Sequence, residues 1–143
     1  MLAILKRSTG RSGRGEGGQS LVEFALVAPI FLLVLFAIVD FGMAFHAWIT
    51  VTNSAREGAR VGAVRADAAT IEQRVRSTAD TLDQANLTVS VQGAQGQPGQ
   101  SVVVAAQYDY PLITPLADLL NLVSGGAIPT TFNLDSTADM RLE

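Results

Sequence analysis

Cysteine is absent from this chain of 143 residues, and histidine occurs once, as His46. The lack of cysteine excludes disulfides, thiolate metal sites, cysteine nucleophiles and a lipidated N-terminal cysteine. His46 has no clustered partner in the sequence, which favours an interfacial side chain over a metal ligand. The chain also lacks a Ser/His/Asp order and a glycine-rich phosphate loop, and the acids of its C-terminal half are scattered singly. The sequence therefore indicates no catalytic residues, no metal site, no cofactor and no small-molecule substrate.

Clustered basic residues are confined to one short segment at the N-terminus. Residues 1–18 carry four basic side chains against one acid, whereas the whole chain has a net charge of -3. No later stretch offers a basic face for a phosphate backbone, so nucleic acid is not an expected partner. A basic end followed by an apolar run is typical of membrane orientation, and it predicts a cytoplasmic N-terminus with the remaining chain outside.

Only one long apolar run occurs, from Leu21 to Val39, and Glu23 is its single charged residue. As a helix rising about 1.5 Å per residue it covers roughly 28 Å, close to the hydrocarbon thickness of about 30 Å. Pro29 lies inside the run and predicts a local kink or a looser backbone. The helical pattern continues to about residue 64, and Asp40 is expected at an exposed interface position near the outer end of the span.

Small residues recur at spacings of four further along this predicted helix. Such a stripe allows another backbone to approach closely, either from a second subunit or from the chain's own sheet, and we favour the second. The candidate helix-packing residues are Ala55, Gly58, Ala59, Gly62 and Ala63. Between them, Arg56, Glu57 and Arg60 are expected to form a solvated face, with Glu57 and Arg60 paired at i,i+3 spacing.

The remaining sequence predicts a small α+β domain. Segments with apolar residues at helical spacing predict helices, and segments in which every second residue is apolar predict strands. A glycine-rich connector between two of these strands predicts a hairpin. The expected elements are a helix at 68–82 after an Asp67 N-cap, strands at 86–92 and 101–110, a short apolar helix inside 111–126 that is a candidate to cover the sheet, and a closing strand at 130–143. The predicted fold class is α+β: a long N-terminal transmembrane helix continuing into a small external domain with helices and an antiparallel sheet of about three strands. The predicted divisions are a cytoplasmic basic leader at 1–18, the transmembrane helix and its outer extension at 19–47, and an external domain at 48–143.

Three features coincide where the apolar run begins: the basic leader, the junction between Gly18 and Gln19, and Glu23 at the fifth position counted from Gln19. A secretory signal would be cut after its apolar core, where "GMA" at 42–44 is a weak candidate. The arrangement instead resembles a type IV prepilin signal. The run "GQSLVEFALVAPIFLLVLFAIVDFG" with "NSAREGARVGAV" resembles the TadE-like family, the small pseudopilins or minor pilins of the tight-adherence (Flp, type IVb) pilus system. This resemblance is sharpest over residues 17–66.

The resemblance implies a non-enzymatic role in pilus assembly. It implies that a prepilin peptidase cuts between Gly18 and Gln19, and that Glu23 pairs with the amine of a neighbouring subunit. The implied location is the bacterial cytoplasmic (inner) membrane, with a single span, a cytoplasmic N-terminus and an external C-terminal domain that can enter a pilus. The implied partners are the membrane, the peptidase, other pilin or pseudopilin subunits and tight-adherence assembly proteins.

Two other functions stay open at this stage. A pseudopilin of a secretion system would share the processing, and neighbouring genes for a tight-adherence ATPase and a prepilin peptidase would separate the two. An uncleaved single-pass anchor could instead carry an external binding module. The loop at 93–100 and the sheet edge could serve such binding, although no convergent polar cluster marks a pocket there.

Overall fold

The computed structural model describes residues 16–143, with side chains described from residue 18 onward. The predicted leader therefore lies, up to residue 15, outside the described residues. Helix α1 runs from Glu16 to Ala63 and continues through Pro29. The chain divides into one compact unit that ends at Leu35 and a second unit that spans Phe36–Glu143.

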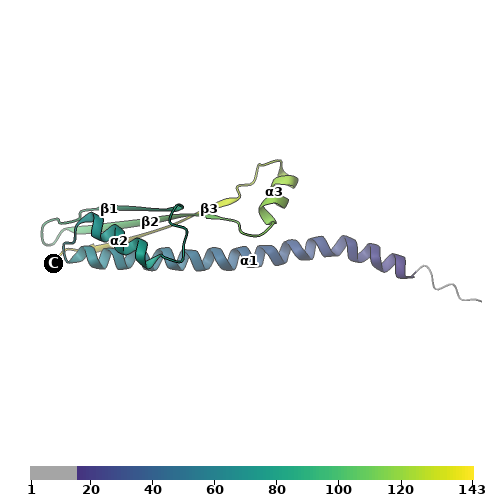
Figure 1. The fold of residues 1–143 in the computed structure, drawn as a ribbon, viewed down its shortest axis with the longest axis horizontal. Coiled ribbons are helices and arrows are strands. Elements are labelled where there is room, and N and C mark those ends of the chain that lie inside the picture. Colours follow the sequence, from purple (N-terminus) through teal and green to yellow (C-terminus); the bar gives the residue numbers. More distant parts are fainter. Residues whose placement is uncertain (1–15) are drawn as a thin grey trace, which may run out of the picture. The chain divides into compact units, whose positions relative to one another are not determined.

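The second unit is an α+β domain, which confirms the predicted fold class (Figure 1). Its strands form one antiparallel sheet in the order β1-β2-β3. After the C-terminal part of α1, the elements are α2 (Ala68–Thr78), β1 (Leu87–Gln92), β2 (Ser101–Pro111), α3 (Leu116–Ser124) and β3 (Thr131–Arg141).

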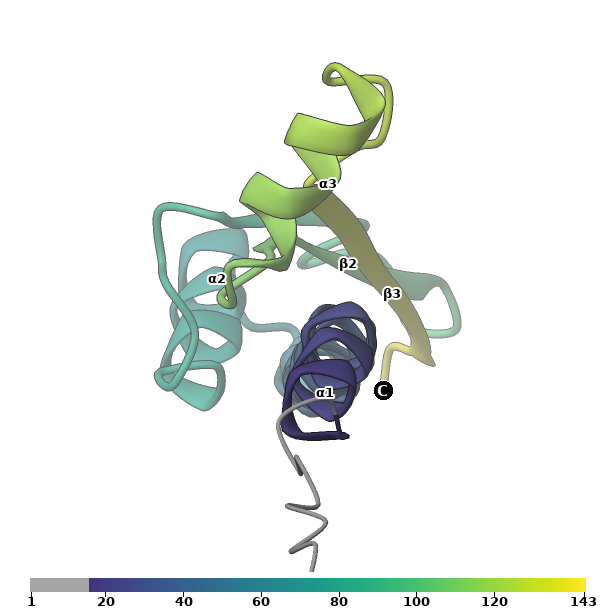
Figure 2. The same cartoon turned by 90° about the vertical axis from the view of Figure 1, so that its right-hand side faces the viewer.

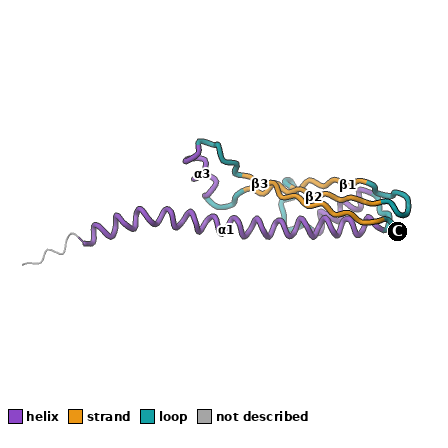
Figure 3. The backbone as a smooth tube through the Cα atoms, turned by 180° about the vertical axis from the view of Figure 1, so that it is seen from behind, coloured by secondary structure: helices purple, strands orange, loops and turns teal. Residues whose placement is uncertain are grey.

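The core lies between one face of the sheet and two helices. Alternate residues of β2 are buried, as the period of two predicts, and they face the C-terminal part of α1 together with α2 (Figures 2 and 3). The principal core residues are Val51, Ala55 and Ala59 of α1, Ile71 and Val75 of α2, and Val102, Val104 and Ala106 of β2. The small side chains of α1 let this helix lie close to both α2 and the sheet.

Helix α2 is shorter than predicted and ends at Thr78 instead of continuing to Leu82. The Gln84 side-chain amide donates hydrogen bonds to the carbonyl oxygens of Ala79 (2.8 Å) and Leu82 (3.1 Å). These bonds satisfy carbonyls that lie just beyond the end of α2 and have no intrahelical partner. Leu82 still packs against the core, from the turn that leads into β1.

The glycine-rich connector at 93–100 closes the predicted hairpin between β1 and β2. Gly93 has a φ of 75°, and a Cβ there would lie 2.3 Å from the carbonyl oxygen of Ser101, so the turn requires glycine. The other end of the connector pairs with the C-terminus, where Leu142 donates a backbone bond of 2.7 Å to the Gln100 carbonyl. The connector is thus held by the sheet itself.

Helix α3 does not cover the sheet, contrary to the expectation from its apolar sequence. It lies beyond the end of β2 and β3 (Figure 1), and none of its residues is buried. It ends where predicted, because Gly125 adopts the left-handed conformation with a φ of 63°. The face of the sheet opposite the core carries half-buried and exposed side chains from β2.

Candidate processing and assembly site

The predicted processing site lies in the first turns of α1. Gly18, Gln19 and Glu23 are all exposed. The Gln19 side-chain amide donates a hydrogen bond of 2.9 Å to the Glu23 carboxylate, one helical turn away. This amide is therefore a partner of Glu23, the predicted assembly residue.

Folding of the described residues does not explain why position 18 is glycine. A Cβ at Gly18 would meet no atom within 4 Å, and its φ lies outside the left-handed region. Glycine inside a helix costs about 1 kcal/mol relative to alanine. Gly18 carries this cost without a close packing contact among the described residues in return.

The helix beyond Glu23 exposes its apolar side chains on all sides. It is the one helix among residues 16–143 that is long and apolar enough to cross a membrane, and its most apolar 18-residue window is not buried at all. Phe24, Leu26 and Phe31, for example, are each more than 60% exposed. Such a surface is not that of a soluble core helix, and it fits a single membrane span.

The small-residue stripe packs within the chain. A Cβ at Gly58 would lie 2.4 Å from Val75 Cγ2 of α2 and 3.3 Å from Val104 Cγ1 of β2. A Cβ at Gly62 would lie 2.9 Å from Val102 Cγ2. Ala55 and Ala59 are fully buried, and Ala63, which is half-buried, accepts a backbone bond from Glu143 at 3.0 Å.

Asp40 is not at the exposed interface position that we expected. Only 2% of it is accessible, and its carboxylate accepts backbone hydrogen bonds from Ile113 (2.9 Å) and Thr114 (3.3 Å) as well as a bond from the Thr114 hydroxyl. The chain after β2 folds over the acid and supplies these donors. No local signal could have revealed the contact, because the partners lie 73 and 74 residues away.

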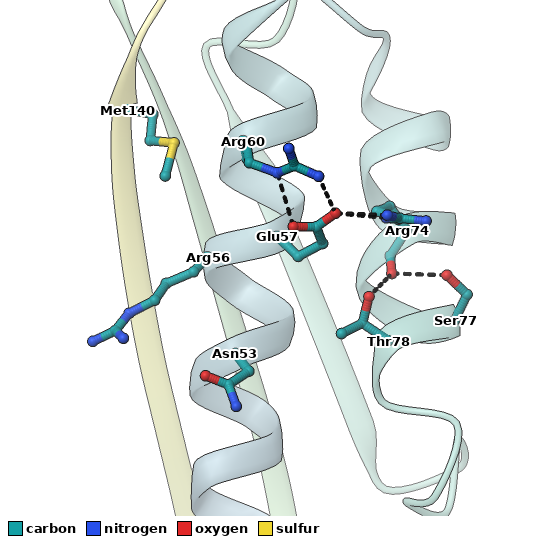
Figure 4. A pocket seen from close by; sticks show the side chains of 8 residues that line it. All are labelled: Asn53, Arg56, Glu57, Arg60, Arg74, Ser77, Thr78 and Met140. Atoms are coloured by element: carbon teal, nitrogen blue, oxygen red, sulfur yellow. Dashed lines mark hydrogen bonds and ion pairs between the residues drawn. The ribbon is translucent and has the colours of Figure 1, made fainter.

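Glu57 joins the two helices that cover the sheet. Its carboxylate is 2.8 Å from Arg60, the predicted partner on α1, and 2.6 Å from Arg74 on α2 (Figure 4). The shallow cleft around them is lined by these three paired side chains together with Arg56. Hydrogen bonds from Arg60 and then Arg74 lower the pKa of Glu57 to about 2. The sequence does not indicate the contact of Arg74, because a pattern of residues within α2 carries no information about an acid on another helix.

Stability should depend on the charge of Glu57 at low pH. The folded-state pKa lies below the ordinary value of about 4.3 for an unfolded chain, so the stabilisation is complete above about pH 4.3 and is lost as the pH falls toward 2. We expect Glu57→Gln to unfold at a lower temperature than the wild type at pH 7, with the two midpoints converging near pH 2. Thermal unfolding of the full chain in detergent, followed by circular dichroism across this range, measures the effect. Midpoints that stay equally separated at all pH values would contradict it.

The fold and the exposed first turns of α1 define a class: a protein with one apolar, membrane-compatible helix and a small α+β domain. Within that class, the family model described as TadE-like protein matches residues 18–60. The match confirms the family resemblance found in the sequence, and it begins at Gly18. It covers less than half of the chain, and it suggests a protein associated with a tight-adherence pilus system. Neither the curated proteins nor the solved structures contain a match to this chain.

Proposed function

We propose that this chain is a non-enzymatic, membrane-anchored TadE-like pseudopilin that takes part in assembling a tight-adherence type IV pilus. The observation that carries the proposal is the TadE-like match over residues 18–60, which starts at the exposed Gly18 and includes Glu23. The single apolar helix supports membrane insertion. The proposed location is the bacterial inner membrane, with the N-terminus in the cytoplasm and Phe36–Glu143 largely outside.

The proposed processing step is hydrolysis of the peptide bond between Gly18 and Gln19 by a prepilin peptidase. Water adds across the bond, leaving a carboxylate on Gly18 and an ammonium group on Gln19. This cation is created in the first turn of the remaining helix, four residues from Glu23. An isolated carboxylate at the bilayer centre costs about 2.5–3.5 kcal/mol by insertion scales, and a cationic partner offsets part of that cost.

In the proposed assembly step, Glu23 of one subunit pairs with the new amine of a neighbouring subunit. Within the uncut chain, Glu23 is held by the neutral amide of Gln19 at 2.9 Å. A charge-assisted hydrogen bond is roughly twice as strong as a neutral one, so the amine of a neighbour can replace this amide. Cleavage would thus supply the stronger partner of the acid at the moment when the subunit becomes competent to assemble.

N-terminal sequencing of the membrane-bound protein tests the processing step. We expect a mature chain that starts at Gln19. We also expect Gly18→Val to leave the leader uncut, because valine places a branched side chain in space that is open beside Gly18. Gly17→Val, at the preceding glycine, is the matched control and should still be cut. A wild-type chain starting at Met1 or near Ala44 would rule out the proposed cleavage and favour an uncut anchor or a secretory signal.

A further inference from the structure

The segment between β2 and β3, residues 112–130, is apolar but unburied, and we call it the apolar arm. It contains α3, and Asp118 is its only charged residue. Leu122 and Val123, near the end of α3, are 81% and 87% exposed, and Ile113 is 57% exposed. Large apolar side chains gathered on one exposed segment mark a contact surface for another apolar phase or partner.

The apolar arm is attached to α1 at the point where the predicted membrane span ends. Asp40 follows Val39, the last residue of the apolar run, and it binds the backbone of Ile113 and Thr114 at the start of the arm. The same contacts surround the carboxylate with donors, so its charge is not presented to the surface. The arm is therefore attached to α1 at the residue that follows the predicted span.

A groove of about 430 Å³ lies between the arm and α1. Its accessible walls are mostly apolar and include Phe41, Ala44, Leu112, Leu116 and Leu120, while Asp40 and Asn133 are the polar residues of its lining. Tyr110 also lines the groove, and its buried hydroxyl has no hydrogen-bond partner within the described chain. The hydroxyl is not accessible from the groove, so the surface that a ligand would meet is apolar, which suits a hydrocarbon chain.

The surface next to the groove has the character of a membrane interface. Phe41 is 74% exposed, and Phe45 and Trp48 follow on the same helix with exposed rings whose centroids are 5.8 Å apart. Tryptophan and tyrosine collect at the boundary between lipid and water because their rings carry a polar group, and Trp48 is such a residue. Phe41 lines the groove and precedes the other two rings on α1, so the groove is next to this aromatic segment.

We propose that the apolar arm rests in the outer leaflet of the bilayer that α1 spans, with a phospholipid acyl chain in the groove. Lipid is favoured over a second copy of the chain because the arm is nearly free of charge and starts at the outer end of the span. The inference rests on insertion of α1, which is part of the proposed function, and does not depend on pilus assembly. Like an interfacial helix, α3 would fix the height of the external domain above the membrane.

Tryptophan fluorescence in vesicles of brominated-chain phospholipid tests the contact, because the chain has a single tryptophan. In a Trp48→Phe background of the full chain, Leu122→Trp reports on the arm and Leu120→Trp on the groove. Phe31→Trp in the apolar run and Ser90→Trp on an exposed position of β1 are the lipid and water controls. We expect both arm variants to lose at least about half as much fluorescence as the Phe31 variant, since an interfacial helix lies about 5–10 Å into the boundary region.

The other outcomes separate the alternatives. If Leu122→Trp is as little quenched as Ser90→Trp and emits as in water, the arm does not touch lipid and the inference is wrong. If it is unquenched but emits as in an apolar environment, protein covers the arm, which favours a second copy and also overturns the inference. If Phe31→Trp is unquenched, α1 is not inserted in the bilayer. That result would overturn both the proposed membrane topology and the inference.

Discussion

Replacing Glu23 by alanine is expected to abolish pilus formation while cleavage after Gly18 continues. The variant removes the only carboxylate of the apolar run and leaves the processing junction intact. A hydrogen bond to a charged group contributes about 1.5–3 kcal/mol, which corresponds to roughly a 10- to 150-fold loss in the affinity of one subunit for the next. Glu23→Gln should show a similar defect, because it keeps the shape of the side chain and removes its charge. Sheared filaments, quantified by immunoblot and counted by electron microscopy, measure the result.

Gln19→Ala is the matched control for this prediction. It removes the side-chain amide that contacts Glu23 at 2.9 Å, but it retains the amine that cleavage would create on residue 19. We therefore expect nearly normal pili from this variant. If Glu23→Ala assembled pili as well as the wild type, and changes in the external loops abolished a binding activity instead, the chain would be better described as an anchored binding module.

The order and type of the elements could be predicted because their signals are local. Burial alternates along strand β1 as expected, with Leu87 buried and Thr88 exposed. The glycine-rich connector predicts the hairpin between β1 and β2, which the structure contains. The end of α3 at Gly125 follows from a single residue that tolerates a positive φ. In each case the determining interactions lie within a few residues, so periodicity and turn chemistry are sufficient.

The contacts of Asp40 and Glu57 could not be predicted, since they join residues that are distant in the sequence. The residues around Asp40 in the sequence predict an exposed acid at a membrane boundary. In the structure, the segment that begins at Ile113, 73 residues further along the chain, covers it. In the sequence Arg74 is an ordinary polar residue of α2, but its guanidinium group lies 2.6 Å from the carboxylate of Glu57. The placement of α3 failed for a related reason, because an apolar face indicates that something is contacted without indicating what.

The largest effect on stability is expected from Gly58→Val. Position 58 is enclosed by α2 and β2, and even a single added carbon would lie 2.4 Å from Val75 Cγ2. Overpacking of this kind costs about 1–3 kcal/mol, which lowers the midpoint of thermal unfolding by about 4–24 °C for a domain of this size. Circular dichroism of the full chain in detergent measures the shift.

Gly42→Val separates this steric effect from a general effect of valine in α1. Gly42 lies on the same helix, is exposed, and has no atom within 4 Å of an added Cβ, so its replacement should leave the midpoint unchanged or slightly higher. Equal midpoints for the two variants would show that the stripe does not carry the packing seen between α1, α2 and β2. A Gly58→Val protein that keeps the wild-type midpoint but forms no pili would assign the stripe to contacts between subunits. If instead its stability falls while the Gly42 variant stays normal, close approach within one chain is what these glycines provide.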